Sequence, residues 1–340
     1  MKKLNFSVFL LSLVLLLSSC AASGGYRSNN FFVMDTLAEV RAYGANKSAG
    51  NAMIEAKKVA EDLEAKISAT KEGSDTYGFN HVQANDFSAE FIELTKLSIG
   101  FSELTDGCFD ATAGALIHLW KGCEAEGRLP TEQEKATALN ALGYQKIQVS
   151  ENSVTKQDAA LMMDFGAIGK GYAADKMAES LKENGVSCGM VSFISSVTVF
   201  GERDFKIGIR QSDTSGELCG YVTLRNQSLS VSGDYERFYE IDDQRYPHIL
   251  DPKTGEPVSS ELHSVAVIAD SGVAADALST AIFVMGMQKA AELYQKNELD
   301  FEFLCIGGDR IVLSDGFACQ FEARTDAYRL ISLSDYISEN

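Results

Sequence analysis

The sequence has no excess of basic residues. Its 30 lysines and arginines stand against 48 aspartates and glutamates, which gives a formal net charge of −18. Nucleic-acid backbones are bound by basic surfaces, so this balance argues against a nucleic-acid partner. The chain also has no internal repeat or low-complexity linker between residues 31 and 335. Together with a hydrophobic content of 45%, this continuity predicts one large globular domain with a full core.

Several motifs with a recognised chemistry are also missing. No CxxC pair occurs among the six cysteines that follow Cys20, so the sequence does not support a thiolate metal site. Scattered cysteines in a large core are more often buried thiols, although an exported chain could oxidise them. There is no HExxH motif and no P-loop, and nothing marks a Ser-His-Asp triad.

The chain has no hydrophobic run long enough to span a bilayer comfortably at its N-terminus. Two lysines precede a short apolar run over 6–17, and small residues stand directly before Cys20. The pattern predicts a lipoprotein signal peptide over 1–19, lipid attachment at Cys20 and a tether over 20–30. The protein is then expected at the extracytoplasmic face of a bacterial cell membrane. An ordinary signal peptide with an incidental cysteine is the alternative.

Periodicity predicts helices in the first half of the chain, followed by a strand-rich half with late helices. This order indicates an α+β fold, with mixed or antiparallel sheets packed by helices, over residues 31–335. Thr131 and Glu134 have the spacing of a capping box. The helices are expected over 51–67, 88–101, 131–143, 172–184 and 272–286. The strands are expected over 159–163, 189–194, 197–200, 205–209, 221–225, 229–232, 238–241, 264–269, 301–306 and 311–313.

The segment Asp164–Asp175 is the most informative in the chain. An apolar run ends at Asp164, and a loop with three glycines and Lys170 leads into an amphipathic helix. Glycines permit close approach of a ligand, and the free amides at a helix start favour anions. The segment predicts a site for a phosphorylated ligand, with Gly169 and Lys170 at its centre. A surface lysine after a tight turn is the alternative reading.

Asp276 and Thr280 stand four residues apart in an otherwise apolar helix, which puts both side chains on one face. With a nearby carbonyl such as that of Ala167, they would suit Mg²⁺, which prefers oxygen ligands and keeps part of its shell for phosphates. An aspartate near a helix N-terminus, with a threonine bonded back to the backbone, is the alternative. One of only four histidines, His248, lies before a turn with proline and glycine, and it could act as a general base.

Taken together, five segments in this order resemble the ApbE family of FAD:protein FMN transferases. Phe32–Thr36 resembles the opening Met-Gly-Thr of the family, and Thr105–Gly114 its Thr-Asp-Gly-x-Phe-Asp-x-Thr segment. Asp164–Asp175 matches the most diagnostic motif, and His248–Gly255 the His-Ile-x-Asp-Pro-x-Thr-Gly motif. Asp276–Thr280 resembles the metal-binding helix.

The resemblance implies cleavage of the FAD diphosphate with Mg²⁺, transfer of FMN to a threonine of an exported redox protein, and release of AMP. It implies Ala167, Asp276 and Thr280 as metal ligands and Lys170 and His248 as catalytic residues. The residues that it implies for binding FAD are Met34, Thr36, Phe109, Asp110, Gly169, Lys170, Tyr172, Asp175, Ser232 and His248.

Two positions depart from the family pattern. Asp35 replaces the glycine of Met-Gly-Thr, and Ser192–Ser196 stands where the family usually shows Asn-x-Gly-Gly followed by Asn or Asp. Ile194 and Ser195 thus replace a glycine pair at which a backbone approaches the ligand closely. A flavin-binding lipoprotein that has lost turnover through the Ser192–Ser196 changes therefore stays open. An FAD pyrophosphatase, in which water replaces the threonine, stays open as well, because the attacking group comes from outside the chain.

Overall fold

The computed structural model describes residues 25–44, 49–82, 86–212, 215–235, 237–242, 244–296 and 298–339. The predicted signal peptide over 1–19 and the predicted lipid site at Cys20 lie outside these residues. Among the described residues, no helix combines the length and the apolar character that crossing a membrane requires.

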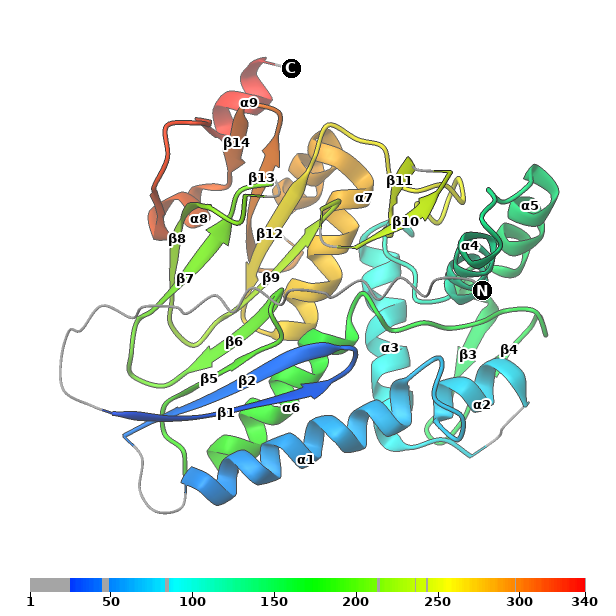
Figure 1. Cartoon of the computed structure of the whole chain (residues 1–340), viewed down its shortest axis with the longest axis horizontal. Helices are drawn as coiled ribbons and strands as arrows, with labels where there is room; N and C mark the ends of the chain where they lie inside the picture. The colour runs from blue at the N-terminus through cyan, green and yellow to red at the C-terminus, as the bar shows by residue number, and fades with distance from the viewer. Residues whose placement is uncertain are drawn as a thin grey trace, which may run out of the picture.

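A nine-stranded sheet forms the centre of the molecule, with the strand order β1-β2-β5-β6-β9-β12-β13-β14-β16 (Figure 1). Neighbouring strands are antiparallel except for the parallel pair β14 and β16. The strands are β1 (Tyr26–Val33), β2 (Thr36–Tyr43), β5 (Gly189–Ser192), β6 (Ser196–Phe200), β9 (Ser228–Gly233), β12 (Ser264–Ala269), β13 (Phe301–Gly307), β14 (Arg310–Leu313) and β16 (Arg329–Ser332).

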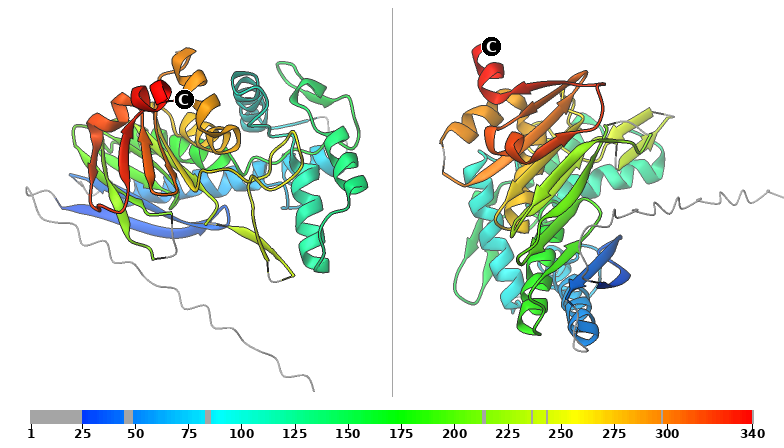
Figure 2. Two further views of the ribbon diagram at one scale, coloured as in Figure 1. Left: turned by 90° about the horizontal axis from the view of Figure 1, so that it is seen from above. Right: turned by 90° about the vertical axis from the view of Figure 1, so that its left-hand side faces the viewer.

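Helices cover one face of this sheet, and a small three-stranded sheet packs on the other. On the helical side lie α1 (Ala49–Ile67), α3 (Ala89–Leu104), α6 (Gly169–Glu183) and α7 (Gly272–Lys296). The small sheet consists of β7 (Phe205–Arg210), β8 (Leu218–Leu224) and β15 (Phe321–Ala323). Figure 2 shows this layered arrangement from two further sides.

The central strand β12 shows that the sheet is covered on both faces. All six of its residues are buried. Val265 and Val267 belong to the core beneath the helices, whereas Ala266 and Ile268 belong to the core beneath the small sheet. Alternate side chains of a strand point to opposite faces, so a continuous apolar run is expected of a strand that is covered on both sides.

The remaining elements lie around the sheet. The helices α4 (Gly114–Glu126) and α5 (Glu132–Ala141) stand apart from it, near the hairpin of β10 (Phe238–Ile241) and β11 (Gln244–Pro247). Trp120, Tyr239 and Leu250 share a small core there. The short elements are α2 (Asp75–His81), the 3-10 helix η1 (Tyr144–Lys146), β3 (Ile147–Val149), β4 (Val154–Lys156), α8 (Asp315–Gln320) and α9 (Leu333–Glu339).

The α+β prediction is confirmed, and each predicted helix is present with bounds close to those expected. Thr131 and Glu134 form the predicted capping box at the start of α5. Gly286 has φ 77°, so it interrupts the helical backbone at the predicted end of the late helix, and a further helical segment continues to Lys296. Glycine adopts this conformation without the clash that a Cβ would cause.

The predicted strand over 159–163 is wrong. Met162 makes one isolated bridge to Ala113, Ala159 and Ala160 lie in a turn, and Leu161 and Met163 have no strand partner. The Asn80 side chain accepts a hydrogen bond from the Met163 amide and donates one to the Met163 carbonyl. Lys156 donates to the Leu161 carbonyl at 2.8 Å. Side chains therefore satisfy the backbone that a neighbouring strand would otherwise pair.

The predicted tether over 20–30 is wrong for Tyr26 and the residues after it. They pair with β2 as part of β1, with Tyr26 opposite Tyr43. Most of the first half of β1 is exposed, so it carries little of the apolar alternation by which a strand is recognised.

Candidate functional site

The centre of the candidate site is Asp276, whose side chain is almost fully buried in the first half of α7. Its Oδ2 accepts a hydrogen bond of 2.9 Å from the Gly171 amide. Its Oδ1 lies 3.8 Å from the Nζ of Lys170. The predicted phosphate loop and the predicted metal-binding helix are therefore in direct contact, although 105 residues separate Gly171 from Asp276.

Two glycines make this contact possible, because α6 and α7 cross where both helices begin. A Cβ on Gly171 would lie 2.0 Å from the Gly272 carbonyl oxygen, and a Cβ on Gly272 would lie 2.6 Å from the Gly171 carbonyl oxygen. Real Cβ atoms do not approach backbone so closely, hence neither position accepts a side chain without a backbone shift. Gly171 is thus needed for helix packing as well as for its amide.

The loop amides are less available to phosphate than the sequence suggests. The Gly169 amide donates to the Phe165 carbonyl at 2.7 Å, and the Gly171 amide donates to Asp276. Lys170 remains the cation of this loop; its Nζ also donates to the Gly166 carbonyl at 3.3 Å. The anion-binding role predicted for the loop therefore depends on Lys170 more than on these two amides.

The sheet contributes hydroxyl groups that face the helices. We call this set the hydroxyl ladder: Ser196 and Thr198 on β6, and Ser228, Ser230 and Ser232 on β9. Ser196 pairs with Ser230 across the two antiparallel strands, and Thr198 pairs with Ser228. The hydroxyl oxygens are 3.0 Å apart in the first pair and 2.9 Å apart in the second. The residues between them, such as Val197 and Leu229, face the small sheet.

Each step of the hydroxyl ladder meets a polar side chain of a helix. Ser196 and Ser230 donate to Oδ1 of Asp276 at 3.0 and 2.8 Å. Ser232 Oγ lies 3.2 Å from Thr280 Oγ1 and 2.9 Å from Ser279 Oγ. Ser232 and Thr280 are half-buried, unlike the fully buried Ser230, so the ladder opens toward solvent at Thr280.

Sequence reasoning identified Ser232 but not Ser196, Ser230 or the other members of the ladder. A signal for them exists: the segment 228–232 reads Ser-Leu-Ser-Val-Ser, and 196–198 reads Ser-Val-Thr. Hydroxyl residues at alternate positions of two strands occupy one face of a sheet. A polar stripe of this kind on a strand that is otherwise buried indicates partners on the opposing layer.

Asp175 supports the start of α7. Its two oxygens accept hydrogen bonds from the Gly272 and Val273 amides at 2.7 and 3.0 Å, and Thr198 approaches it at 3.4 Å. Burial raises the pKa of Asp175 to about 6. An aspartate that accepts the first amides of a helix stabilises that helix end. Its predicted contact with FAD stays a prediction.

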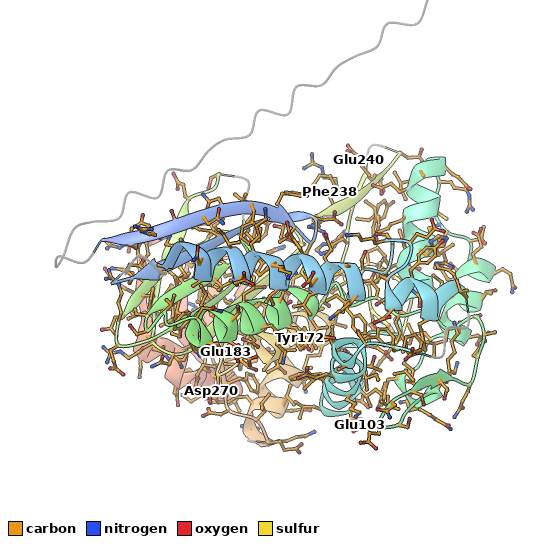
Figure 3. The ribbon with its side chains drawn as sticks, turned by 90° about the horizontal axis from the view of Figure 1, so that it is seen from below. Glu103, Tyr172, Glu183, Phe238, Glu240 and Asp270 are labelled. Atoms are coloured by element: carbon orange, nitrogen blue, oxygen red, sulfur yellow. The ribbon has the colours of Figure 1, made fainter. Side chains whose placement is uncertain are left out.

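Three other residues predicted to bind FAD make hydrogen bonds or packing contacts within the protein. The Tyr172 hydroxyl donates to Glu93 on α3 at 2.6 Å, and Figure 3 shows Tyr172 where α6 meets α3. The ring of Phe109 is buried and packs edge-on against Phe101. Asp110 accepts hydrogen bonds from the Thr112 amide and hydroxyl and from the Tyr144 amide. Burial raises the pKa of Asp110.

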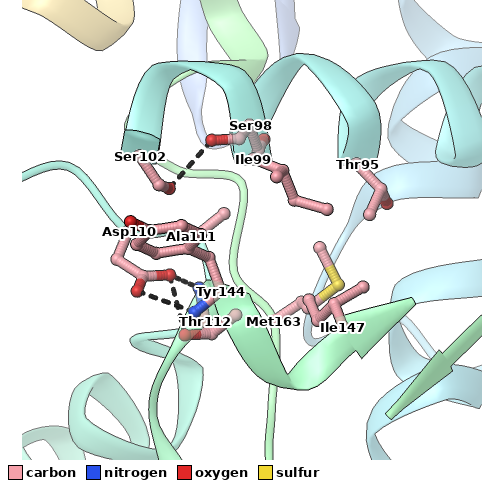
Figure 4. Close-up of a pocket in the computed structure, with 10 residues that line it drawn as sticks. All are labelled: Thr95, Ser98, Ile99, Ser102, Asp110, Ala111, Thr112, Tyr144, Ile147 and Met163. Carbon is pink, nitrogen blue, oxygen red and sulfur yellow. Dashed lines mark hydrogen bonds between the residues drawn. The ribbon is translucent and has the colours of Figure 1, made fainter. Parts of the chain in front are cut away.

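Asp110 also lines a small space between α3 and its own loop, which Figure 4 shows with its neighbours. This space is too narrow for a water molecule, and it is lined by core residues such as Ile99 and Met163. It is a gap in packing and does not offer room for a nucleotide. The roles predicted for Phe109, Asp110 and Tyr172 stay predictions.

His248 lies at the end of β11 with its imidazole held by the backbone. Its Nδ1 lies 2.9 Å from the Arg237 carbonyl oxygen. A carbonyl can only accept, so Nδ1 carries the proton and Nε2 keeps its lone pair. Burial, together with the nearby charges of Arg237 and Lys170, lowers the pKa of His248 to about 4. The imidazole is therefore neutral near pH 7, with Nε2 able to accept a proton.

Arg237 also connects this histidine to the turn between β1 and β2. Its guanidinium donates to the Asp35 carbonyl at 3.2 Å. Met34 and Asp35 occupy the turn with φ 52° and 55°, and the Met34 amide donates to Glu64 at 2.7 Å. Arg237 therefore links Asp35, which stands between the predicted residues Met34 and Thr36, to His248.

The oxygen donors that surround Asp276 fit a divalent cation such as Mg²⁺. Asp276 is a buried carboxylate whose only cation within 4.0 Å, among the residues that the structure describes, is Lys170. The described residues contain no group of three or more His, Cys, Asp or Glu side chains that could hold a metal ion by themselves. A cation here would be held by one carboxylate, the Thr280 hydroxyl, the Ala167 carbonyl and the oxygens of a substrate, which is typical of Mg²⁺ at phosphate sites.

The turn between β5 and β6 holds Ile194 and Ser195, which stand in place of the glycine pair. Ile194 has φ 62°, which is a glycine-like backbone conformation, and its side chain is 60% exposed. The Ser195 carbonyl accepts from the Val231 amide, and Ser196 reaches Asp276. The departure from the family pattern therefore places backbone strain at Ile194. Ser196, at the end of the same turn, still donates a hydrogen bond to Asp276.

Comparisons with known proteins agree on one family. The sequence model of the ApbE family matches residues 34–304. The FAD:protein FMN transferase of Haemophilus influenzae is 30% identical over 321 residues, which cover 88% of this chain and 92% of that protein. The Escherichia coli K12 protein of the same name is 31% identical over 257 residues, covering 72% of this chain and 73% of its own length.

Solved structures show the same fold. The crystal structure of the ApbE protein of Thermotoga maritima superposes with a TM-score of 0.79 at 28% identity, covering 88% of this chain and all of that one. The apo form of the flavinyl transferase ApbE of Pseudomonas stutzeri has a TM-score of 0.75 at 25% identity, covering 89% of this chain and 98% of its own.

Proposed function

The chain belongs to the ApbE family and is a flavin transferase, and we propose that it uses Mg²⁺ to cleave FAD and attach FMN to a threonine of a partner protein. In this reaction the threonine oxygen attacks the phosphorus on the flavin side of the diphosphate. A phosphoester bond to threonine forms, the bond between the two phosphates breaks, and AMP leaves.

One observation carries the proposal: at the start of α6, the Lys170 ammonium and the Gly171 amide both lie next to the buried carboxylate of Asp276. Asp276, Thr280 and the Ala167 carbonyl would hold the cation, which would neutralise the diphosphate and the charge that develops on it. Lys170 would bind a phosphate oxygen as a compact positive charge. Nε2 of the neutral His248 would accept the threonine proton.

The acceptor is proposed to be an exported redox protein that carries the target threonine. The N-terminal pattern supports this, because lipid attachment at Cys20 would hold the enzyme at the extracytoplasmic face of the membrane. Enzyme and acceptor would then share one compartment.

One experiment separates transfer from its alternatives. The protein is incubated with FAD and Mg²⁺, with and without an FMN-binding domain that bears the threonine, and the acceptor mass and AMP are followed. Transfer is expected to produce AMP and to add the mass of FMN to the acceptor. AMP without added mass would instead indicate hydrolysis by water. No AMP in either sample would contradict both enzyme functions and would leave flavin binding.

Replacement of Asp276 by alanine tests the metal site. Asp276→Ala is expected to lose Mg²⁺-dependent AMP release, since the other proposed ligands are one hydroxyl and one carbonyl. The measurement is the AMP release rate across a Mg²⁺ titration. Asp270→Ala, an exposed carboxylate just before α7, is the matched control and should behave as the wild type. An unchanged rate in Asp276→Ala would remove this helix from the mechanism.

A further inference from the structure

Ser196 and Ser230 form the most completely buried step of the hydroxyl ladder. Their side chains are 1% and 0% exposed, and they face each other across β6 and β9. Both hydroxyls donate to one oxygen of Asp276, at 3.0 and 2.8 Å. The two serines are 34 residues apart in the chain, and Asp276 follows Ser230 by 46 residues.

The carboxylate of Asp276 is held from several directions. Its Oδ1 accepts from the two serines, and its Oδ2 accepts from the Gly171 amide. A carboxylate has about four acceptor sites, so three are occupied and roughly one remains for another partner. Donors from β6, β9 and α6 thus fix the orientation of the carboxylate of a residue that is 3% exposed.

The same arrangement recurs at the second proposed side-chain ligand. Ser232 stands two residues beyond Ser230 on the same face of β9, and its hydroxyl lies 3.2 Å from that of Thr280. Asp276 and Thr280 are four residues apart on α7, so their spacing along the helix matches the spacing of Ser230 and Ser232 along the strand. The sheet therefore supports both proposed ligands by side-chain hydroxyls.

We propose that Ser196 and Ser230 are positioning residues that hold Asp276 ready to bind a divalent cation. This inference rests on the proposed function, because it assigns Asp276 as a metal ligand. Hydrogen bonds to a ligating carboxylate fix its orientation, and the loss of such a partner typically lowers metal affinity about 10- to 100-fold. The serines would act through Asp276 and would not touch the substrate.

Ser228 offers a matched control for Ser230. Both serines lie on the same face of β9, both are 0% exposed, and each pairs with a hydroxyl of β6. Ser228 bonds to Thr198, at the step of the ladder that approaches Asp175, whereas Ser230 bonds directly to Asp276. Alanine at either position removes one buried hydroxyl from the same strand, so a general effect on the core would appear in both variants.

The test measures Mg²⁺ binding to the full-length protein in detergent, without FAD, by isothermal titration calorimetry. Ser230→Ala and Ser196→Ala are expected to raise the Mg²⁺ dissociation constant about tenfold, with Ser228→Ala within twofold of the wild type. In the same two variants, the rate of AMP release at saturating Mg²⁺ should change by a much smaller factor than the Mg²⁺ dissociation constant. Ser230→Thr keeps a hydroxyl and should restore most of the affinity.

Two outcomes would overturn the inference: wild-type Mg²⁺ affinity in both alanine variants that contact Asp276, or an equal loss in Ser228→Ala. If Ser230→Ala does not fold, Ser196→Ala and Ser230→Thr carry the comparison. The proposed function fails separately, because a wild-type protein that binds Mg²⁺ but releases no AMP would contradict transfer alone. Normal turnover together with unaltered Mg²⁺ affinity in the variants would contradict positioning alone.

Discussion

At the scale of single residues, Ile194 is the clearest departure from what its side chain prefers. It is β-branched and has φ 62° in the turn between β5 and β6. The left-handed conformation costs an L-residue roughly 1–2 kcal/mol, and glycine avoids this cost. The side chain is 60% exposed, so packing returns little of it. The sequence shows that isoleucine replaces a glycine here, but only the structure shows that this isoleucine has a left-handed backbone.

Ile194→Gly is therefore expected to raise the free energy of unfolding by roughly 0.5–1 kcal/mol, because relief of strain exceeds the added freedom of the unfolded chain. Urea denaturation measures the change. Ile54→Gly is the control, since Ile54 is 59% exposed within α1. Glycine in a helix should lower the same quantity by about 0.5–1 kcal/mol. A loss of stability in both variants would show that Ile194 is not strained.

Burial changes the pKa of His248, a residue that its sequence motif identified. The pKa of its imidazole falls to about 4, below the ordinary value of 6.5. Above pH 6.5 the side chain is neutral in both the folded and the unfolded chain. Between pH 6.5 and 4 the unfolded chain binds a proton that the folded chain does not. The contribution of His248 to stability is therefore present above pH 6.5 and is lost as the pH falls toward 4.

We expect the wild type to lose more stability than His248→Asn when the pH is lowered from 7.5 to 5. Asparagine does not titrate, so the variant lacks this proton uptake. Urea denaturation at both pH values measures the difference, with His81→Asn as a control because His81 is an exposed histidine. Equal pH dependence in the wild type and His248→Asn would mean that the imidazole keeps an ordinary pKa.

At the scale of elements, the crossing of α6 and α7 determines the site. Local sequence predicts both helices, since each shows apolar periodicity and begins at glycine. It does not predict that the two helix starts touch, because this contact depends on how both helices pack on the sheet. Gly171 and Gly272 reveal the contact only when the distance between their backbones is known.

Gly171→Ala is expected to lower the free energy of unfolding by roughly 3 kcal/mol, because its Cβ would lie 2.0 Å from the Gly272 carbonyl oxygen. Gly100→Ala is the control: Gly100 lies inside α3, and a Cβ there would have open space. Alanine should stabilise that helix by roughly 0.5–1 kcal/mol. Guanidinium denaturation of the two variants gives the comparison, and similar effects would contradict the close crossing.

At the scale of the whole molecule, the net charge of −18 has to be reconciled with an anionic substrate. Lys170 is one positive charge, and the pull of a helix dipole is worth only about 0.3–1 kcal/mol. Binding of a diphosphate to such a protein is therefore expected to depend strongly on a divalent cation. Overall charge and the phosphate loop together predict this dependence from sequence.

FAD together with Mg²⁺ is expected to raise the melting temperature well above the value with FAD and EDTA. A ligand at a hundred times its dissociation constant stabilises the folded state by about 2.7 kcal/mol. Thermal denaturation with each addition alone and with both together measures the coupling. An equal rise with FAD in EDTA would show that the protein binds the diphosphate without the cation.

The sequence by itself determined the α+β class and the order of the motifs, and it named Lys170, His248, Asp276 and Thr280 as candidate site residues, because these depend on local periodicity and on short motifs. Only the tertiary structure decided which groups surround Asp276. Ser196 and Ser230 come opposite each other through the register of β6 and β9, and the crossing of α6 and α7 brings Gly171 and Asp276 within 2.9 Å. β6 and β9 are not consecutive in the chain, so which strands become neighbours, and where two helices cross, depends on packing between distant segments.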